Sequence, residues 1–136
     1  MAYLFKQKLV FKPVPPARLV FVVEPEEYLL ELYCKHLLAE QYEVRGFRDL
    51  DALVLPPGRG AGPDVAVIST QQLRRPDFQD IKTEKLPASV KIISVGSSTD
   101  ADFIRNLMSM GVSSHLERRL TRPRDLVEIV GALFYH

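Results

Sequence analysis

Five short apolar runs, separated by segments with helical spacing, most constrain what this chain can fold into. The runs cover residues 18–24, 42–47, 65–69, 90–95 and 112–116. The first of them, RLVFVVE, is a continuous block of β-branched and other apolar residues. Such a block is typical of a strand that is buried on both faces. The five runs therefore predict five short strands of an interior sheet.

Helical patterns fill the segments between these runs. Apolar residues recur at helical spacing in residues 26–40 and 100–110, and again from Pro123, while residues 76–85 show a weaker and more polar pattern. Asp49 can cap a short helix that ends before Pro56-Pro57. Strands that alternate with helices predict a doubly wound (βα)5 fold, with a five-stranded parallel sheet covered by helices on both faces.

Ligands of such folds bind beyond the carboxyl ends of the strands. In this chain that edge would carry Glu24, Ser69-Thr70, residues 96–98 and residues 115–119. This edge is therefore where a functional site is expected.

Composition fits one globular domain, because the chain has 136 residues of which 46% are hydrophobic. A net charge of +1 gives no bulk attraction to nucleic acid or to an acidic membrane surface. The single cysteine, Cys34, excludes an internal disulfide and shares a helical face with Leu30, Leu37 and Leu38, which indicates a core thiol. Neither a long apolar segment nor a signal-peptide pattern is present, so we expect a cytoplasmic protein that does not insert into membranes.

Residues 1–17 form a separate segment, and residues 18–136 form the domain itself. Tyr3, Phe5, Leu9 and Phe11 alternate with polar residues, a pattern that favours an extra strand with one buried face. We expect an N-terminal arm that docks on its own sheet edge or on that of a second copy, giving a homodimer. A disordered tail is the alternative.

Four stretches carry a resemblance to a known family. VVEPEE before the first helix, YEV in the second run, PDVAVIS in the third and GVSSHL in the fifth resemble, in order and spacing, the receiver domains of response regulators. The resemblance covers residues 18–134 and implies the receiver (flavodoxin-like) fold of the bacterial two-component signalling proteins.

The resemblance also implies that the phosphorylation site is degenerate. Ser69 stands where the family has the aspartate that accepts the phosphoryl group. Glu24 matches the first acid of the magnesium-binding pair, but Pro25 replaces the second and offers no side-chain oxygen. We therefore expect no bound metal, no cofactor and no phosphorylation.

Three further positions of the family's site are changed. Gly96 replaces the hydroxyl residue after the fourth strand, and His115 replaces the aromatic residue of the fifth. Arg118 keeps the charge of the family's lysine, whereas Arg119 replaces the proline that follows it. Together these changes predict an atypical receiver, or pseudo-receiver, that is not an enzyme.

Other kinds of site are less well supported by the sequence. Ser69, His115 and Glu24 could form a hydrolase triad, but the sequence around Ser69 is not a nucleophile elbow. The glycine-rich run 58–63 precedes a strand, whereas phosphate-binding loops follow one, so we interpret it as a connector. His36, His115 and His136 show no metal-ligand spacing with each other or with Cys34.

A cluster of arginines at residues 118–124 is either the solvent-exposed start of the last helix or a docking surface. The resemblance implies a partner-binding face made by helix four, strand five and helix five. That face would display Arg105, Asn106, Met110, Arg118, Arg119 and Arg122. Arginine suits the recognition of carboxylates on a protein partner, while binding of DNA without a recognition helix is the weaker alternative.

The sequence thus predicts a phosphorylation-independent signalling or localisation adaptor that acts by protein–protein interaction. Two alternatives stay open. The domain could sense a small ligand at the edge formed by Ser69, Ser97 and His115, or it could be a regulatory domain of a larger signalling or transcription protein.

Overall fold

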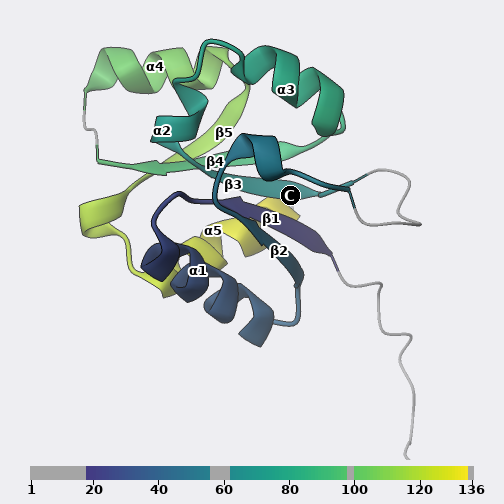
Figure 1. Ribbon diagram of the computed structural model, residues 1–136. Coiled ribbons are helices and arrows are strands. Elements are labelled where there is room, and N and C mark those ends of the chain that lie inside the picture. Colours follow the sequence, from purple (N-terminus) through teal and green to yellow (C-terminus); the bar gives the residue numbers. More distant parts are fainter. Residues whose placement is uncertain (1–17, 56–61, 98–99, 135–136) are drawn as a thin grey trace, which may run out of the picture.

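The computed structural model describes residues 18–55, 62–97 and 100–134 (Figure 1). The expected N-terminal arm and residues 58–61 of the glycine-rich run lie outside the described residues. The arm and the connector therefore stay predictions.

Five parallel strands form one sheet in the order β2-β1-β3-β4-β5. Their bounds are β1 Leu19–Val23, β2 Glu43–Phe47, β3 Val65–Ser69, β4 Lys91–Gly96 and β5 Val112–Glu117. Every pair of neighbouring strands is parallel, which confirms the predicted doubly wound sheet.

Helices connect successive strands and cover both faces of the sheet. They are α1 Glu27–Ala39, α2 Thr70–Leu73, α3 Phe78–Lys85, α4 Ala101–Ser109 and α5 Pro123–Phe134, together with the short 3-10 helices η1 Leu50–Ala52 and η2 Arg118–Leu120. Figure 1 shows α1 and α5 on one face, and α2, α3 and α4 on the other. None of the helices in the described ranges is long and apolar enough to span a membrane.

The core is divided by the sheet into two layers. Phe21 and Ile92 point into the layer under α3 and α4, whereas Val22 and Ile93 point into the layer under α1 and α5. All residues of β1 and β3 are buried, as expected of strands covered on both sides. This arrangement explains why those two runs lack a polar alternation.

Two residues that continue the apolar helical patterns are exposed. Leu38 is 55% exposed and Met108 is 40% exposed, although both continue an apolar pattern. Each follows a residue that does face the core, Leu37 in α1 and Leu107 in α4, so the helix turns it away from the sheet. In each helix, the apolar sequence pattern therefore extends one residue beyond the buried face.

Two connections also differ from prediction. Asp49 does act as a cap, since its carboxylate accepts a hydrogen bond from the Ala52 amide at 3.0 Å, but the capped segment is 3-10 helix η1. Helix α2 begins directly after Ser69 and was not predicted, because four residues carry no readable periodicity.

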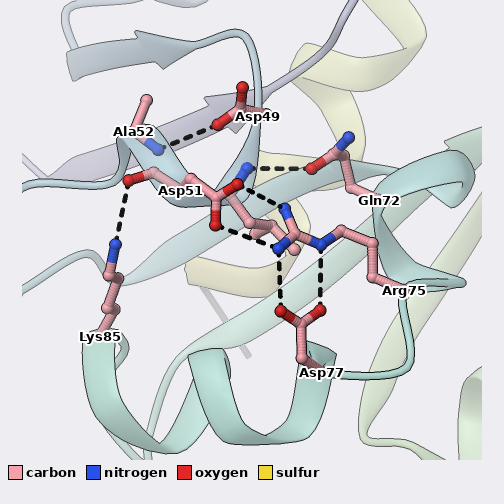
Figure 2. Close-up of polar contacts among 8 residues, drawn as sticks. Asp49, Asp51, Ala52, Gln72, Arg75, Asp77 and Lys85 are labelled. Carbon is pink, nitrogen blue, oxygen red and sulfur yellow. Dashed lines mark hydrogen bonds and ion pairs between the residues drawn. The ribbon is translucent and has the colours of Figure 1, made fainter.

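Polar contacts hold η1 against the segment that joins α2 to α3 (Figure 2). The Arg75 guanidinium donates to Asp51 at 3.0 and 3.2 Å and to Asp77 at 2.9 and 3.0 Å. Gln72 accepts a hydrogen bond from the Leu50 amide at 2.9 Å, and Lys85 donates to the Asp51 carbonyl at 3.1 Å. These contacts fix the connection after β2 to the one after β3.

Left-handed residues end α1 and α4. After α1, the Gln41 amide donates to the Leu38 carbonyl and the Tyr42 amide to that of Leu37, which is the Schellman arrangement. Gln41 takes a φ of 72° there, and Gly111 takes a φ of 96° at the corresponding place after α4. Glycine adopts this conformation without strain, whereas glutamine does not.

Candidate functional site

Glu24 and Arg118 form an ion pair at the carboxyl edge of the sheet. Glu24 directly follows β1 and is 3% exposed, and Arg118 begins η2 after β5. The Arg118 guanidinium donates to one carboxylate oxygen of Glu24 at 2.8 Å. The other oxygen accepts the Glu26 amide at 2.9 Å. A protein cation and a backbone amide therefore hold the carboxylate that the resemblance assigns to a metal ion.

Tyr33 of α1 lies beside this pair. Burial raises the pKa of Tyr33 above its ordinary value of 10.0, and the nearby Arg118 charge partly opposes that rise. The Arg118 Nε is buried and has no hydrogen-bond partner among the described residues. The guanidinium is thus engaged on its Glu24 side and incompletely satisfied elsewhere.

Ser69 and Gly96 are the last residues of the neighbouring strands β3 and β4. Ser69 is 3% exposed, and no hydrogen bond joins its side chain to another described residue. A Cβ atom added at Gly96 would overlap the hydroxyl of Thr70 and lie 2.8 Å from the Thr70 Cβ. The Thr70 side chain therefore fills the space that a side chain at position 96 would need.

His115 does not reach this edge. Its Nδ1 lies 2.8 Å from the Ser94 hydroxyl, and the two residues pair directly across β4 and β5. A register shift between Ile92 and Ile93 leaves Ser113 unpaired and turns His115 toward the same face as Ser94. The Ser69, His115 and Glu24 triad is therefore not assembled.

Metal-binding features are sparse in the described ranges. No group of three histidine, cysteine, aspartate or glutamate side chains lies close enough there to hold an ion. Pro25, at the second acid position, contributes its carbonyl to Arg48 Nε at 2.7 Å. Burial raises the pKa of the Cys34 thiol to about 11, so it is a poor metal ligand and a poor nucleophile at neutral pH.

Carboxylates of the same chain accompany the predicted docking arginines. Arg119 pairs with Glu117 at 3.4 Å, and Arg122 pairs with Asp125 at 3.3 Å. Arg105 pairs with Asp102 one helical turn away. Arg119 and Arg122 remain about 70% exposed (72% and 69%), whereas Arg118 is turned inward to Glu24. The exposed part of the basic cluster is thus smaller and less charged than the sequence indicates.

The two remaining residues of the predicted face are one helical turn apart but differ in exposure. Asn106 is exposed on α4. Met110 is partly buried, packs against the core layer under α3 and α4, and accepts a hydrogen bond from Gln79 of α3 at 3.5 Å. Met110 therefore supports the helix end, and Met108 is the methionine that α4 exposes.

A pocket of about 280 Å³ opens beside the Glu24–Arg118 pair, and its walls are formed by Thr70, Gln71, Arg74, Ser97 and Arg118. Thr70, Ser97 and Arg118 are at the edge where the sequence predicts them, whereas Gln71 and Arg74 were not expected there, because both belong to the unpredicted α2 segment. Ser94 was not expected as a site residue either, although a serine inside an apolar strand was a visible signal.

The fold matches solved structures of receiver domains. A CheY-like response regulator from Mesorhizobium loti is 20% identical over 86% of this chain and 98% of its own, with a TM-score of 0.69. A response regulator from Thermotoga maritima is 16% identical over 88% of this chain and 99% of its own, with a TM-score of 0.68.

A third similar structure has a different name. The pilus assembly protein CpaE from Caulobacter crescentus is 21% identical over 87% of this chain and 94% of its own, with a TM-score of 0.66. No family model matches the sequence, and comparison with curated proteins finds no significant match. The likeness is thus one of structure, and the chain has the fold of the CheY-like response-regulator receiver domains.

Proposed function

We propose that this protein is a phosphorylation-independent adaptor of the receiver type, which acts in the cytoplasm by binding a protein partner. The observation that carries the proposal is the ion pair between Glu24 and Arg118 beside Ser69. A serine needs a base to become a nucleophile, and no hydrogen bond joins the Ser69 side chain to another residue in the described ranges. The carboxylate that would anchor Mg²⁺ is already engaged by a guanidinium.

A role in localisation or assembly is compatible with one group of structural neighbours. The CpaE proteins from Burkholderia thailandensis and Caulobacter crescentus are named as pilus assembly proteins. The neighbours from Mesorhizobium loti and Thermotoga maritima are named as response regulators. We therefore place the protein among receiver-fold modules whose output is a contact with another protein.

Phosphorylation is tested directly with a small-molecule phosphoryl donor and Mg²⁺. We expect no mass increase of the intact protein under conditions that fully modify a phosphorylatable receiver used as the positive control. A phosphoryl adduct that survives on this chain would overturn the proposal, and mapping it would identify the acceptor.

The partner face is tested with Arg119→Glu and Arg122→Glu in one variant. Arg118 is left unchanged because a glutamate there would place two carboxylates together at Glu24. The matched control changes Lys35 and Arg45 to glutamate, which reverses the same number of charges. Both residues are exposed, on α1 and β2, at the opposite edge of the sheet.

Affinity capture should recover a partner with the wild type and with the control variant, but not with the arginine-face variant. Equal recovery by all three would remove this face from the proposal. The predicted homodimer is tested separately, by light scattering of a full-length variant in which Tyr3, Phe5, Leu9 and Phe11 are changed to serine.

A second candidate function is small-ligand sensing, and the pocket beside Arg118 favours it. The residues differ from those expected, since Ser97 lines the pocket but Ser69 and His115 do not. A metabolite that remains bound through purification and is found by mass spectrometry of the denatured protein would favour this function over the adaptor.

A further inference from the structure

Strand β2 lies at the border of the sheet and has one open edge. Within the described ranges its single neighbour is β1 (Figure 1). The Glu43 amide and the Phe47 carbonyl form hydrogen bonds of 2.9 and 3.0 Å with the residues that flank β1. Because the backbone groups of a strand alternate between its two edges, the amides and carbonyls of Val44 and Gly46 point away from β1. An edge of this kind can pair with another strand.

The side chains of β2 are complementary in charge to a second copy of the same strand. Glu43 and Arg45 share one face of the strand, where their side chains are 33% and 52% exposed and lie 3.5 Å apart. In antiparallel pairing with a two-fold axis between the two Val44 residues, Glu43 of each copy lies opposite Arg45 of the other. Opposite charges directly across two strands stabilise the pairing. Charged residues of one sign protect an edge by repulsion, whereas this arrangement attracts a copy of itself.

The backbone requires the same register as the charges. A two-fold axis at Val44 places its outward amide and carbonyl opposite those of the other copy, so the two residues exchange both hydrogen bonds. Glu43 and Arg45 then form the pairs without backbone hydrogen bonds, in which side chains approach most closely. Two independent features of β2 therefore select one axis.

Helix α1 places an apolar side chain beside this edge. A Cβ atom at Gly46 would lie 3.0 Å from the Cys34 Sγ and 3.1 Å from the Leu30 Cδ1, so this side of α1 packs closely on β2. Leu38 follows Cys34 by four residues and continues the same side of the helix, yet it is 55% exposed. The axis at Val44 keeps α1 of both copies on one face of the joined sheet, where the two Leu38 side chains can be covered.

We propose that two copies of this protein associate through antiparallel pairing of β2, with the two-fold axis between the two Val44 residues. The five strands of each copy then form one continuous sheet. A contact of one short strand and one helix face is small, so the dimer is weak and depends on protein concentration. The association uses neither the N-terminal arm nor the arginine face, and it does not depend on the adaptor role.

The test is sedimentation velocity of the full-length protein over about a hundredfold range of concentration. Glu43→Arg and Arg45→Glu should each raise the dissociation constant of the dimer by about tenfold or more, because each puts two like-charged pairs across the axis. An equimolar mixture of the two variants should associate as tightly as the wild type, since every arginine again faces a glutamate. A wild type that is monomeric at every concentration, or a mixture no tighter than either variant alone, would overturn the proposal.

Arg105→Glu is the matched control, because it reverses an exposed charge on α4 and should leave the dimer unchanged. Weakening equal to that of Arg45→Glu would contradict β2 as the contact. Loss of the dimer in the arm variant alone would assign the contact to the arm instead. If the charge variants do not fold, hydrogen exchange of the wild type decides, since the amides of Val44 and Gly46 should exchange more slowly as the concentration rises. Arg45→Glu should still capture the protein partner, so this proposal and the adaptor role can fail separately.

Discussion

The Glu24–Arg118 pair lies largely inside the molecule, and it is the most buried of the ion pairs between described residues. The Glu24 side chain is 4% exposed, so a change that removes its partner leaves a charged carboxylate without solvent. Exposed pairs such as that of Arg105 with Asp102 are screened by water, and they contribute little to the free energy of unfolding.

Arg118→Gln should therefore lower the free energy of unfolding by about 3 kcal/mol. Arg105→Gln, the control at an exposed pair, should change it by less than about 0.5 kcal/mol. Adding Glu24→Gln to the Arg118 variant should restore part of the loss, since no uncompensated charge remains. Urea unfolding of the four proteins measures these differences. Equal values for the Arg118 and Arg105 variants would show that the buried pair contributes no more to stability than an exposed one.

Gly96 supports a second prediction at the level of single residues. Gly96→Ser should destabilise the fold by about 1–3 kcal/mol, because its Cβ overlaps the Thr70 side chain. Thr70→Ala in the same protein should recover part of that loss, since it removes the hydroxyl and the methyl group that are overlapped. Thermal unfolding of both single variants and of the double variant gives the coupling, and strictly additive effects would contradict the proposed overlap.

At the level of the elements, the ends of α1 and α4 are the places where a substitution should change stability through the backbone conformation. Gln41→Gly should raise the free energy of unfolding by about 0.5–1 kcal/mol, because glycine removes the strain of the φ of 72°. Gly111→Gln is the reciprocal change at the end of α4 and should lower stability by a similar amount. Chemical denaturation measures both, and effects of the same sign would show that backbone conformation is not the cause.

The strands could be predicted to within one residue at each end, because apolar runs between helices leave few alternatives. The bounds of β3 are those expected, and β1 and β2 are each shorter than their runs. The phase of short helices was harder, since the nine residues of α4 span two and a half turns and do not distinguish Met108 from Leu107.

The site was only partly predictable for a related reason. Sequence order brings Glu24 and Arg118 to the same edge, but their contact joins residues 94 positions apart. The place of His115 depends on a one-residue irregularity in β5, and such a shift reverses the face of every residue after it. Neither the long-range contact nor the irregularity in β5 can be recognised from the local sequence pattern.

At the scale of the whole molecule, a few carboxylates link stability to pH. The Arg75 guanidinium holds the pKa of Asp77 below its ordinary value of 3.8, and the Arg122 amide and guanidinium do the same for Asp125. A carboxylate whose pKa is lowered by folding stabilises the native state above its unfolded pKa. That contribution disappears as the pH falls through the lower, folded pKa.

The wild type should therefore lose stability as the pH falls below about 4, and Arg75→Gln should lose less over the same interval. Arg105→Gln is the control, because it removes an arginine from an exposed pair on α4. Urea midpoints measured from neutral pH to acid give the slopes. A slope for Arg75→Gln as steep as that of the wild type would show that the contacts in Figure 2 do not govern the acid response.

The contact between Thr70 and position 96 also limits the routes by which this sequence can change. A single substitution that places a hydroxyl side chain at position 96 destabilises the fold, because the Thr70 side chain already occupies that volume. Position 70 must change first, or both must change together. The order of substitutions is thereby constrained, so descendants of this sequence are expected to keep Gly96 for as long as they keep Thr70.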